Sequence, residues 1–172
     1  MAQARTPAYH ARALYRAGQC AGQLKDWPAV AGHDGELLAA FPQFDRRADA
    51  RYGLGLALRN QDRLPEAIAA FEQVVKETDT ETAAKAQFMI GECLFARKQH
   101  EEAAAQFLKA AYGYPYEEWV GNAHFEAARC FEVLKKLDQA RRSYQILAEK
   151  LPDHPKARVA RERLKDLRGL TP

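Results

Sequence analysis

Cysteine and histidine are the residue types in this 172-residue chain that could hold a metal ion or act as nucleophiles. No pair of them has the CxxC or HxxxH spacing that is typical of a zinc site. The chain also lacks a hydrolase-type Ser-His-Asp or Cys-His spacing and a glycine-rich loop that would cradle a phosphate. We therefore predict no metal site, no cofactor and no catalytic residue, and we expect neither an enzyme nor a small-molecule substrate. The five histidines are scattered, at His10, His33, His100, His124 and His154.

The three cysteines share one place in a recurring pattern. Cys20, Cys93 and Cys130 each stand two residues after a glycine or an alanine, and Ala57 fills the same place once more. Equivalent positions of stacked helices lie about 8–10 Å apart, whereas a disulfide needs Cα atoms within about 7 Å. We therefore expect reduced cysteines that serve as small buried hydrophobic residues.

The recurring pattern covers nearly the whole chain. Its small residues are Gly18, Gly55, Gly91 and Ala128, at intervals of 37, 36 and 37 residues. A helical period in the middle thirties is typical of stacked helix–turn–helix units. The sequence predicts a single all-α domain over 7–170, with repeats over 7–44, 45–81, 82–116 and 117–154. The helices are expected at about 7–24, 28–41, 45–60, 64–77, 82–97, 101–112, 117–134 and 138–150, with a capping helix over 156–168.

The second helix of each later repeat has an apolar face that would form the core. Its residues follow the spacing i, i+4 and i+7, which places them on one side of a helix. The first repeat differs, because Asp34 stands where the others have an aromatic residue. The three sets are Ala67, Phe71 and Val74; Ala103, Phe107 and Ala110; and Ala140, Tyr144 and Leu147.

Composition and charge indicate an ordinary globular chain. Hydrophobic residues make up 47% and charged residues 28%, and no apolar run reaches the roughly 18 residues of a membrane span. The N-terminal segment has no apolar core of a signal peptide, which indicates the cytoplasm, or the periplasm if the chain is an excised fragment of an envelope protein. The net charge of +3 comes from residues 119–172, where basic groups exceed acidic ones. Such an excess is typical of a solvated helix face, with an anionic partner as the alternative.

The repeats resemble the tetratricopeptide repeat family. That family has an aromatic, a small and an apolar residue in the first helix, then an alanine, an aromatic and a proline. The first repeat matches through Tyr15, Gly18, Trp27 and Pro42 and fails at Asp34. The other repeats match through Tyr52, Gly55, Leu58, Leu64, Ala67 and Phe71; through Phe88, Gly91, Leu94, Ala103, Phe107 and Pro115; and through Phe125, Ala128, Phe131, Leu137, Ala140, Tyr144 and Pro152.

One branch of the family is more similar than the others. The slightly long period, the Tyr-Pro and Leu-Pro endings and the closing helix over 156–167 are similar to bacterial envelope repeat proteins. These are the periplasmic coordinator of the Tol-Pal system and the lipoprotein component of outer-membrane assembly. The resemblance implies an envelope scaffold.

The resemblance also implies which helices contact a partner. In this family the first helix of each repeat lines a concave groove of a right-handed α-α superhelix, and the second lies on the convex face. The candidate contact residues on the first helices are Tyr15, Asp49, Tyr52, Arg59, Lys85, Phe88, Glu92, Phe95, Phe125 and Arg129. Two interpretations of the aromatic ones stay open: half-buried packing between repeats, or a groove that grips a peptide.

Family members that bind chaperone tails hold a C-terminal carboxylate with lysine and asparagine. Here the asparagine places hold Gln19, Leu56, Glu92 and Arg129, so this clamp is not expected. The sequence therefore predicts a scaffold that binds a protein or peptide in its concave groove. The alternatives are a homo-oligomerisation module of a larger assembly and a nucleic-acid binder that uses the basic C-terminal end.

Overall fold

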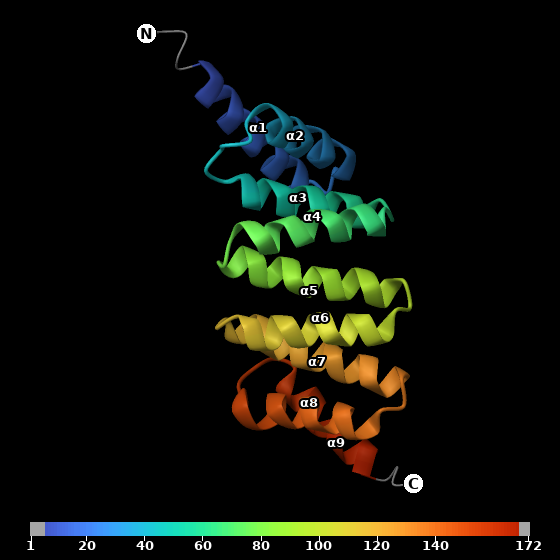
Figure 1. Ribbon diagram of the computed structural model, residues 1–172. Coiled ribbons are helices and arrows are strands. Elements are labelled where there is room, and N and C mark those ends of the chain that lie inside the picture. Colours follow the sequence, from blue (N-terminus) through green and yellow to red (C-terminus); the bar gives the residue numbers. More distant parts are fainter. Residues whose placement is uncertain (1–5, 169–172) are drawn as a thin grey trace. The chain divides into compact units, whose positions relative to one another are not determined.

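The computed structural model describes residues 6–168, except the side chain of Thr6, and over that range it has nine helices and no strand (Figure 1). The all-α prediction is confirmed, and every expected helix begins and ends within two residues of its observed bounds. The helices are α1 (Thr6–Gln23), α2 (Trp27–Ala40), α3 (Arg47–Asn60), α4 (Leu64–Glu77), α5 (Glu81–Ala96), α6 (His100–Gly113), α7 (Glu117–Val133), α8 (Leu137–Lys150) and α9 (Ala157–Arg168).

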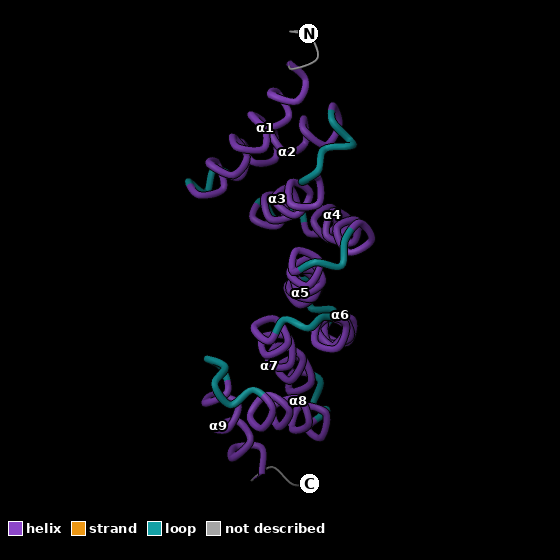
Figure 2. The backbone as a smooth tube through the Cα atoms, turned by 90° about the vertical axis from the view of Figure 1, so that its left-hand side faces the viewer, coloured by secondary structure: helices purple, strands orange, loops and turns teal. Residues whose placement is uncertain are grey.

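The chain divides into two compact units, one ending at Thr78 and the other beginning at Asp79. In the first unit α1 to α4 pack in chain order, and α1 also contacts α3. In the second unit α5 to α9 pack in chain order, and α5 also contacts α7. Seen nearly end-on, α3 and α4 of the first unit lie side by side, as do α6 and α7 of the second (Figure 2). Because α1 contacts α3 and α5 contacts α7, the first helices of successive hairpins are neighbours within each unit.

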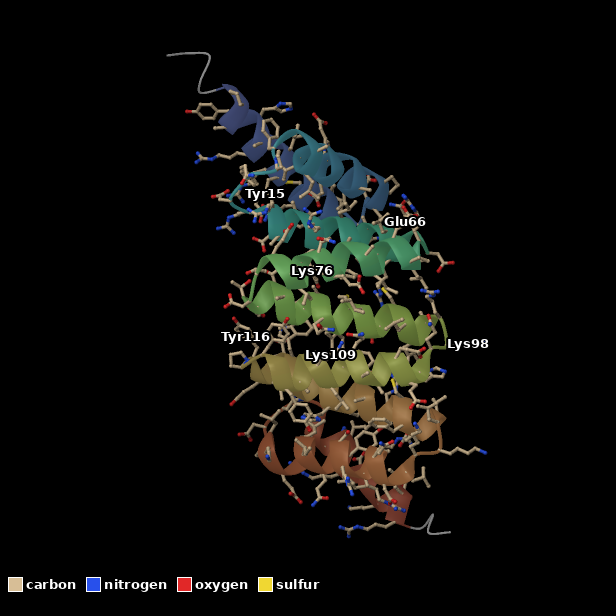
Figure 3. All side chains as sticks on the ribbon, viewed as in Figure 1. Tyr15, Glu66, Lys76, Lys98, Lys109 and Tyr116 are labelled. Carbon is tan, nitrogen blue, oxygen red and sulfur yellow. The ribbon has the colours of Figure 1, made fainter. Side chains whose placement is uncertain are left out.

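The turn inside each hairpin has the same backbone conformation. Lys25, Asp62, Lys98 and Lys135 all have positive φ, between 57° and 62°. The next residue donates its N–H to a carbonyl near the end of the first helix, at 2.8–2.9 Å in all four turns. This pairing is a Schellman motif, which satisfies carbonyls that the helix end would leave unpaired. In the second unit Lys98 lies in one of these turns, and Tyr116 lies just before α7. Figure 3 shows these two residues at opposite ends of the helices.

The core sets predicted for α4, α6 and α8 are fully buried, so their register is confirmed. In the second unit the Phe107 ring lies directly over Gly91 of α5 and also packs against the Phe88 ring, with centroids 5.1 Å apart. Phe71 and Gly55 repeat this arrangement in the first unit. The small residue of the first helix is therefore required because an aromatic ring from the second helix occupies the space of its side chain.

Replacing Gly91 by alanine is expected to lower the free energy of unfolding by about 1–3 kcal/mol, because the new methyl group would overcrowd the core. It would lie 2.6–2.7 Å from two carbons of the Phe107 ring, which the Phe88 ring keeps from moving away. Urea unfolding followed by circular dichroism measures the change. Gly32→Ala is the matched control: nothing lies within 4 Å of its added methyl group, so it should gain up to about 1 kcal/mol of helix propensity. Equal effects of the two substitutions would contradict this packing.

The cysteine prediction is confirmed at two positions and wrong at one. Cys93 and Cys130 are free and buried, whereas Cys20 is free but exposed. Ala57 holds the equivalent place in α3 and is buried against Ala21 and Val30 of the preceding hairpin. Cys20 lies on α1, and the described part of the chain has no hairpin before α1 to cover it.

Helix α9 covers the last hairpin, as expected of a capping helix. Ala157, Ala160 and Leu167 are buried, and Arg141 of α8 donates a hydrogen bond to the Leu167 carbonyl at 2.7 Å. The rest of α9 is mostly charged and exposed. Within residues 6–168, no helix has the length and apolar character needed to cross a bilayer.

Candidate partner-binding surfaces

In the first unit α1 and α3 enclose a cavity of about 210 Å³. Among its lining residues are four that the resemblance places on the groove side of these helices: Tyr15 and Gln19 of α1, and Asp49 and Leu56 of α3. The structure thus brings two candidate contact residues, Tyr15 and Asp49, to one recess. Figure 3 labels Tyr15 on α1.

Asp34 of α2 contributes a buried carboxyl group to this cavity. Its two oxygens approach Gly18 of α1 and Gly53 of α3 so closely that a methyl group on either glycine would overlap them. Burial raises the pKa of Asp34 to about 7, because a low-dielectric surrounding disfavours the charged form. Asp34 therefore holds its proton to a higher pH than an exposed aspartate does.

The other candidate contact residues of the first unit lie further along α3. The Tyr52 ring packs on Phe71 with centroids 5.6 Å apart, and burial raises the pKa of the Tyr52 hydroxyl to about 12. Tyr52 therefore serves mainly the hairpin core. Arg59 lies near the end of α3 and is partly exposed.

In the second unit the aromatic residues of α5 and α7 differ in exposure. Phe88 is only 7% exposed, since its ring lies between Phe107 and Trp119, with centroid distances of 5.1 and 5.5 Å. Phe125 is half-buried on Tyr144, and the Lys156 ammonium lies 4.7 Å from its ring centroid. Packing thus uses most of the Phe88 surface, whereas Phe125 keeps part of its ring accessible.

An arginine of α7 and a phenylalanine of α5 form a pair that is partly exposed. The Arg129 guanidinium lies 5.4 Å from the Phe95 ring centroid, which is a cation–π distance. Arg129 also donates a hydrogen bond to Glu126 at 2.7 Å, and Lys156 bonds the other oxygen of that carboxylate at 2.8 Å. Glu126 is buried, so the two cations neutralise a charge that would otherwise be costly. Phe95 is partly exposed, and the Arg129 side chain beside its ring is fixed by the ion pair with Glu126.

Lys85 and Glu92 complete the candidate residues of α5. Lys85 pairs with Glu81 at 3.0 Å and lies 5.8 Å from the Trp119 ring centroid. Glu92 is partly exposed. The Trp119 indole N–H also donates to Glu81 at 3.0 Å, so this end of α5 is tied to α7.

Three residues of these surfaces were not among the sequence candidates: Trp119, Lys156 and Asp34. Trp119 and Lys156 lie outside the repeated positions, so the period could not indicate that they cover Phe88 and Phe125. Asp34 did give a signal, as a carboxylate in an aromatic slot. That signal alone could not show a cavity.

A cavity of about 640 Å³ lies in the second unit between the start of α7 and the connection from α8 to α9. The His154 ring lies against Gly121 at its edge. Its Nδ1 accepts from the Lys156 N–H at 3.2 Å, and its Nε2 lies 3.2 Å from the Glu118 carbonyl. Both ring nitrogens are thus engaged with the backbone, and His154 fixes the connection before α9.

Models of the tetratricopeptide repeat match residues 35–82, 69–118 and 122–154 of this chain. No curated protein matches its sequence. The resemblance to bacterial envelope proteins stays a prediction, because none of these matches tests it.

Several solved structures share the fold. The apo form of RapI superposes with a TM-score of 0.79 at 14% identity, over 93% of this chain and 48% of RapI. A tetratricopeptide repeat protein from Parabacteroides merdae gives 0.77 at 15% identity, over 94% of this chain and 61% of that protein. YrrB gives 0.69 at 21% identity, over 92% of this chain and 82% of YrrB. The chain thus spans less than two thirds of the length of the first two proteins.

The repeat models cover most of the chain, and every hairpin but the first carries a buried aromatic at the repeated position of its second helix. The chain belongs to the tetratricopeptide repeat family.

Proposed function

We propose that this protein is an interaction scaffold that holds a peptide or a partner helix on the first helices of its hairpins. These are α1 and α3 in the first unit, and α5 and α7 in the second. The observation that carries the proposal is the distribution of aromatic side chains. At the repeated core position the second helices bury Phe71, Phe107 and Tyr144 completely, whereas the first helices keep Tyr15, Phe95 and Phe125 partly accessible. Tyr112, near the end of α6, lies outside this position and is 70% exposed.

Accessible aromatic and arginine side chains suit this role, because such residues supply most of the binding energy at protein interfaces. Phe95 and Arg129 are such a pair, with the ring oriented by its neighbours before any partner arrives. A ring that is already fixed loses little conformational entropy on binding.

The family supports the same class of function. Tetratricopeptide repeat proteins are generally non-catalytic scaffolds, and YrrB is described as having an unusual peptide-binding site. Repeat proteins of this type use long surfaces rather than enclosed pockets. A protein or peptide is therefore the proposed partner, with no catalytic step.

A peptide-display selection on the immobilised chain tests the proposal. The double substitution Arg59→Ala and Arg129→Ala removes one arginine from the first helices of each unit. It should weaken the selected peptides by about ten-fold or more, which corresponds to about 1.4 kcal/mol. Affinities measured by isothermal titration calorimetry and helicity measured by circular dichroism give the readout.

The matched control is Lys109→Ala with Arg142→Ala, which removes two exposed cations from the second helices α6 and α8. This control should change the affinity less than two-fold, within the about 0.5 kcal/mol expected of an unrelated surface change. A loss in the control that equals the loss in the first-helix variant would refute the proposed surface.

A further inference from the structure

The cavity between α1 and α3 has an acidic lining. Asp34 and Asp49 both line it, and none of its lining residues is lysine, arginine or histidine. Tyr15 and Trp27 add two aromatic rings. Carboxylates beside aromatic faces are the surroundings that a cation prefers.

Neither a hydrogen bond nor a charged group contributes to the pKa of Asp34, and its carboxyl group lines the cavity. Its side chain is nevertheless only 4% exposed. Burying a carboxyl group without a donor costs free energy, and such a group in a folded protein calls for a physical explanation. The titratable groups that line the cavity with it are the Tyr15 hydroxyl of α1 and the Asp49 carboxylate of α3. Arg46 interacts with both of these groups and lies 3.5 Å from the Asp49 carboxylate.

The other hairpins show what normally fills this space. In the second and third repeats a phenylalanine ring, Phe71 or Phe107, lies over the glycine of the first helix. In the first repeat Asp34 approaches the equivalent glycine, Gly18, but a carboxyl group is shorter than a ring. The missing ring leaves open space beside Gly18, and Gly53 widens it from α3. The cavity therefore arises from the loss of one aromatic side chain.

We propose that this cavity binds a lysine or arginine side chain of the partner peptide, whose charged end pairs with the Asp34 carboxylate beside Tyr15 and Trp27. The inference rests on the proposed scaffold function and names the anchor residue of its partner. Asp49, at the partly exposed side of the cavity, already pairs with Arg46 at 3.5 Å, so Asp34 is the carboxylate that receives the incoming cation. A basic side chain also supplies hydrogen-bond donors to Asp34.

The test uses an N-acetylated peptide from the display selection that contains one lysine or arginine, so that the N-terminus cannot supply the cation. Asp34→Asn keeps the shape of the side chain and removes its charge. This variant should weaken the peptide by about ten-fold or more. Norleucine in place of the basic residue should weaken it equally, and the two changes together should cost no more than either alone.

Glu72→Gln is the control variant, because Glu72 is an exposed carboxylate on the second helix α4. It should leave the affinity unchanged. Asp34→Phe supplies a second variant, because the introduced phenylalanine ring should fill the cavity as Phe71 fills the equivalent space in the next hairpin. This variant should bind the basic peptide no more tightly than the norleucine peptide. Equal affinity of wild type and Asp34→Asn, or of the basic and norleucine peptides, would overturn the inference while the scaffold function could still stand.

A second measurement does not depend on the selection. Titration of the full chain with n-butylammonium should shift the amide resonances of Gly18 and Gly53 saturably, whereas n-butanol should not. In Asp34→Asn, n-butylammonium should shift neither the Gly18 nor the Gly53 resonance. If n-butylammonium shifts neither amide resonance, the cation site is overturned, whether or not the selection has yielded a peptide. If the resonances shift but the selection yields no peptide, the cation site stands and the proposed scaffold function fails.

Discussion

Replacing Phe107 by alanine is expected to lower the free energy of unfolding by about 3–5 kcal/mol. The ring is fully buried, lies over Gly91 and packs against Phe88, so its removal takes apolar surface out of the core and leaves a cavity. Urea unfolding measures the loss, with helix content followed by circular dichroism.

Leu24→Ala is the control for this prediction. Leu24 is 80% exposed, so its truncation should change the free energy of unfolding by less than about 0.5 kcal/mol. A loss below about 1 kcal/mol in Phe107→Ala would mean that this ring does not hold the hairpin together, and the shared register of the repeats would then be in error.

Asp34→Asn is expected to stabilise the protein at pH 8.5 and to leave it nearly unchanged at pH 4. The pKa of Asp34 is about 7 in the folded protein, above its ordinary value of 3.8. Between those two values the folded state holds the proton more tightly than the unfolded state does. Stability therefore falls as pH rises from about 4 through 7 and is level above that range. The variant has no carboxyl group at this position and should not show the fall.

The shift corresponds to at most about 4 kcal/mol, and solvent screening at a cavity lining lowers the expected effect to about 2–3 kcal/mol. Urea unfolding of both proteins at several pH values measures it. His124 acts in the opposite direction, because burial lowers its pKa to about 4 and stability is lost as pH falls below 6.5. The difference between wild type and variant cancels that contribution. Parallel pH profiles for the two proteins would contradict the burial of an unpaired carboxyl group.

These two substitutions separate the structural and the binding role of one repeated position. Phe107 and Asp34 occupy equivalent places in different hairpins, yet the first stabilises the fold and the second destabilises it above neutral pH. A position that costs stability is expected where a binding site is built, since natural proteins trade stability for function at such sites. Asp34→Phe should therefore gain stability and lose the proposed basic anchor.

Much of the fold follows from the sequence because helical repeats depend on local spacing. The faces Ala67, Phe71 and Val74 and their equivalents needed only the helical period to be assigned to the core. The Schellman turns at Lys25, Asp62 and their equivalents were not expected, because the residues there are not the glycines that usually adopt positive φ.

The binding surfaces were less accessible to sequence reasoning. The candidate Phe88 proves to be buried because Trp119, from the next hairpin, lies on its ring. The cavity at Asp34 depends on glycines from two different helices, Gly18 and Gly53, that meet only after folding. Cys20 is exposed, whereas Ala57 at the equivalent place is buried against Ala21 and Val30 of the preceding hairpin. Contacts between repeats, rather than the repeats themselves, account for these differences.

Mapping a bound peptide by amide chemical shifts is the most direct test of where the protein holds its partner. The full chain should be titrated with a selected peptide, and the shifts assigned residue by residue. We expect the largest shifts on the first helices, at Gly18 and Gly53 in the first unit and at Phe95 and Arg129 in the second. Shifts concentrated on α2, α4, α6 and α8, with these residues unchanged, would contradict the proposed surface.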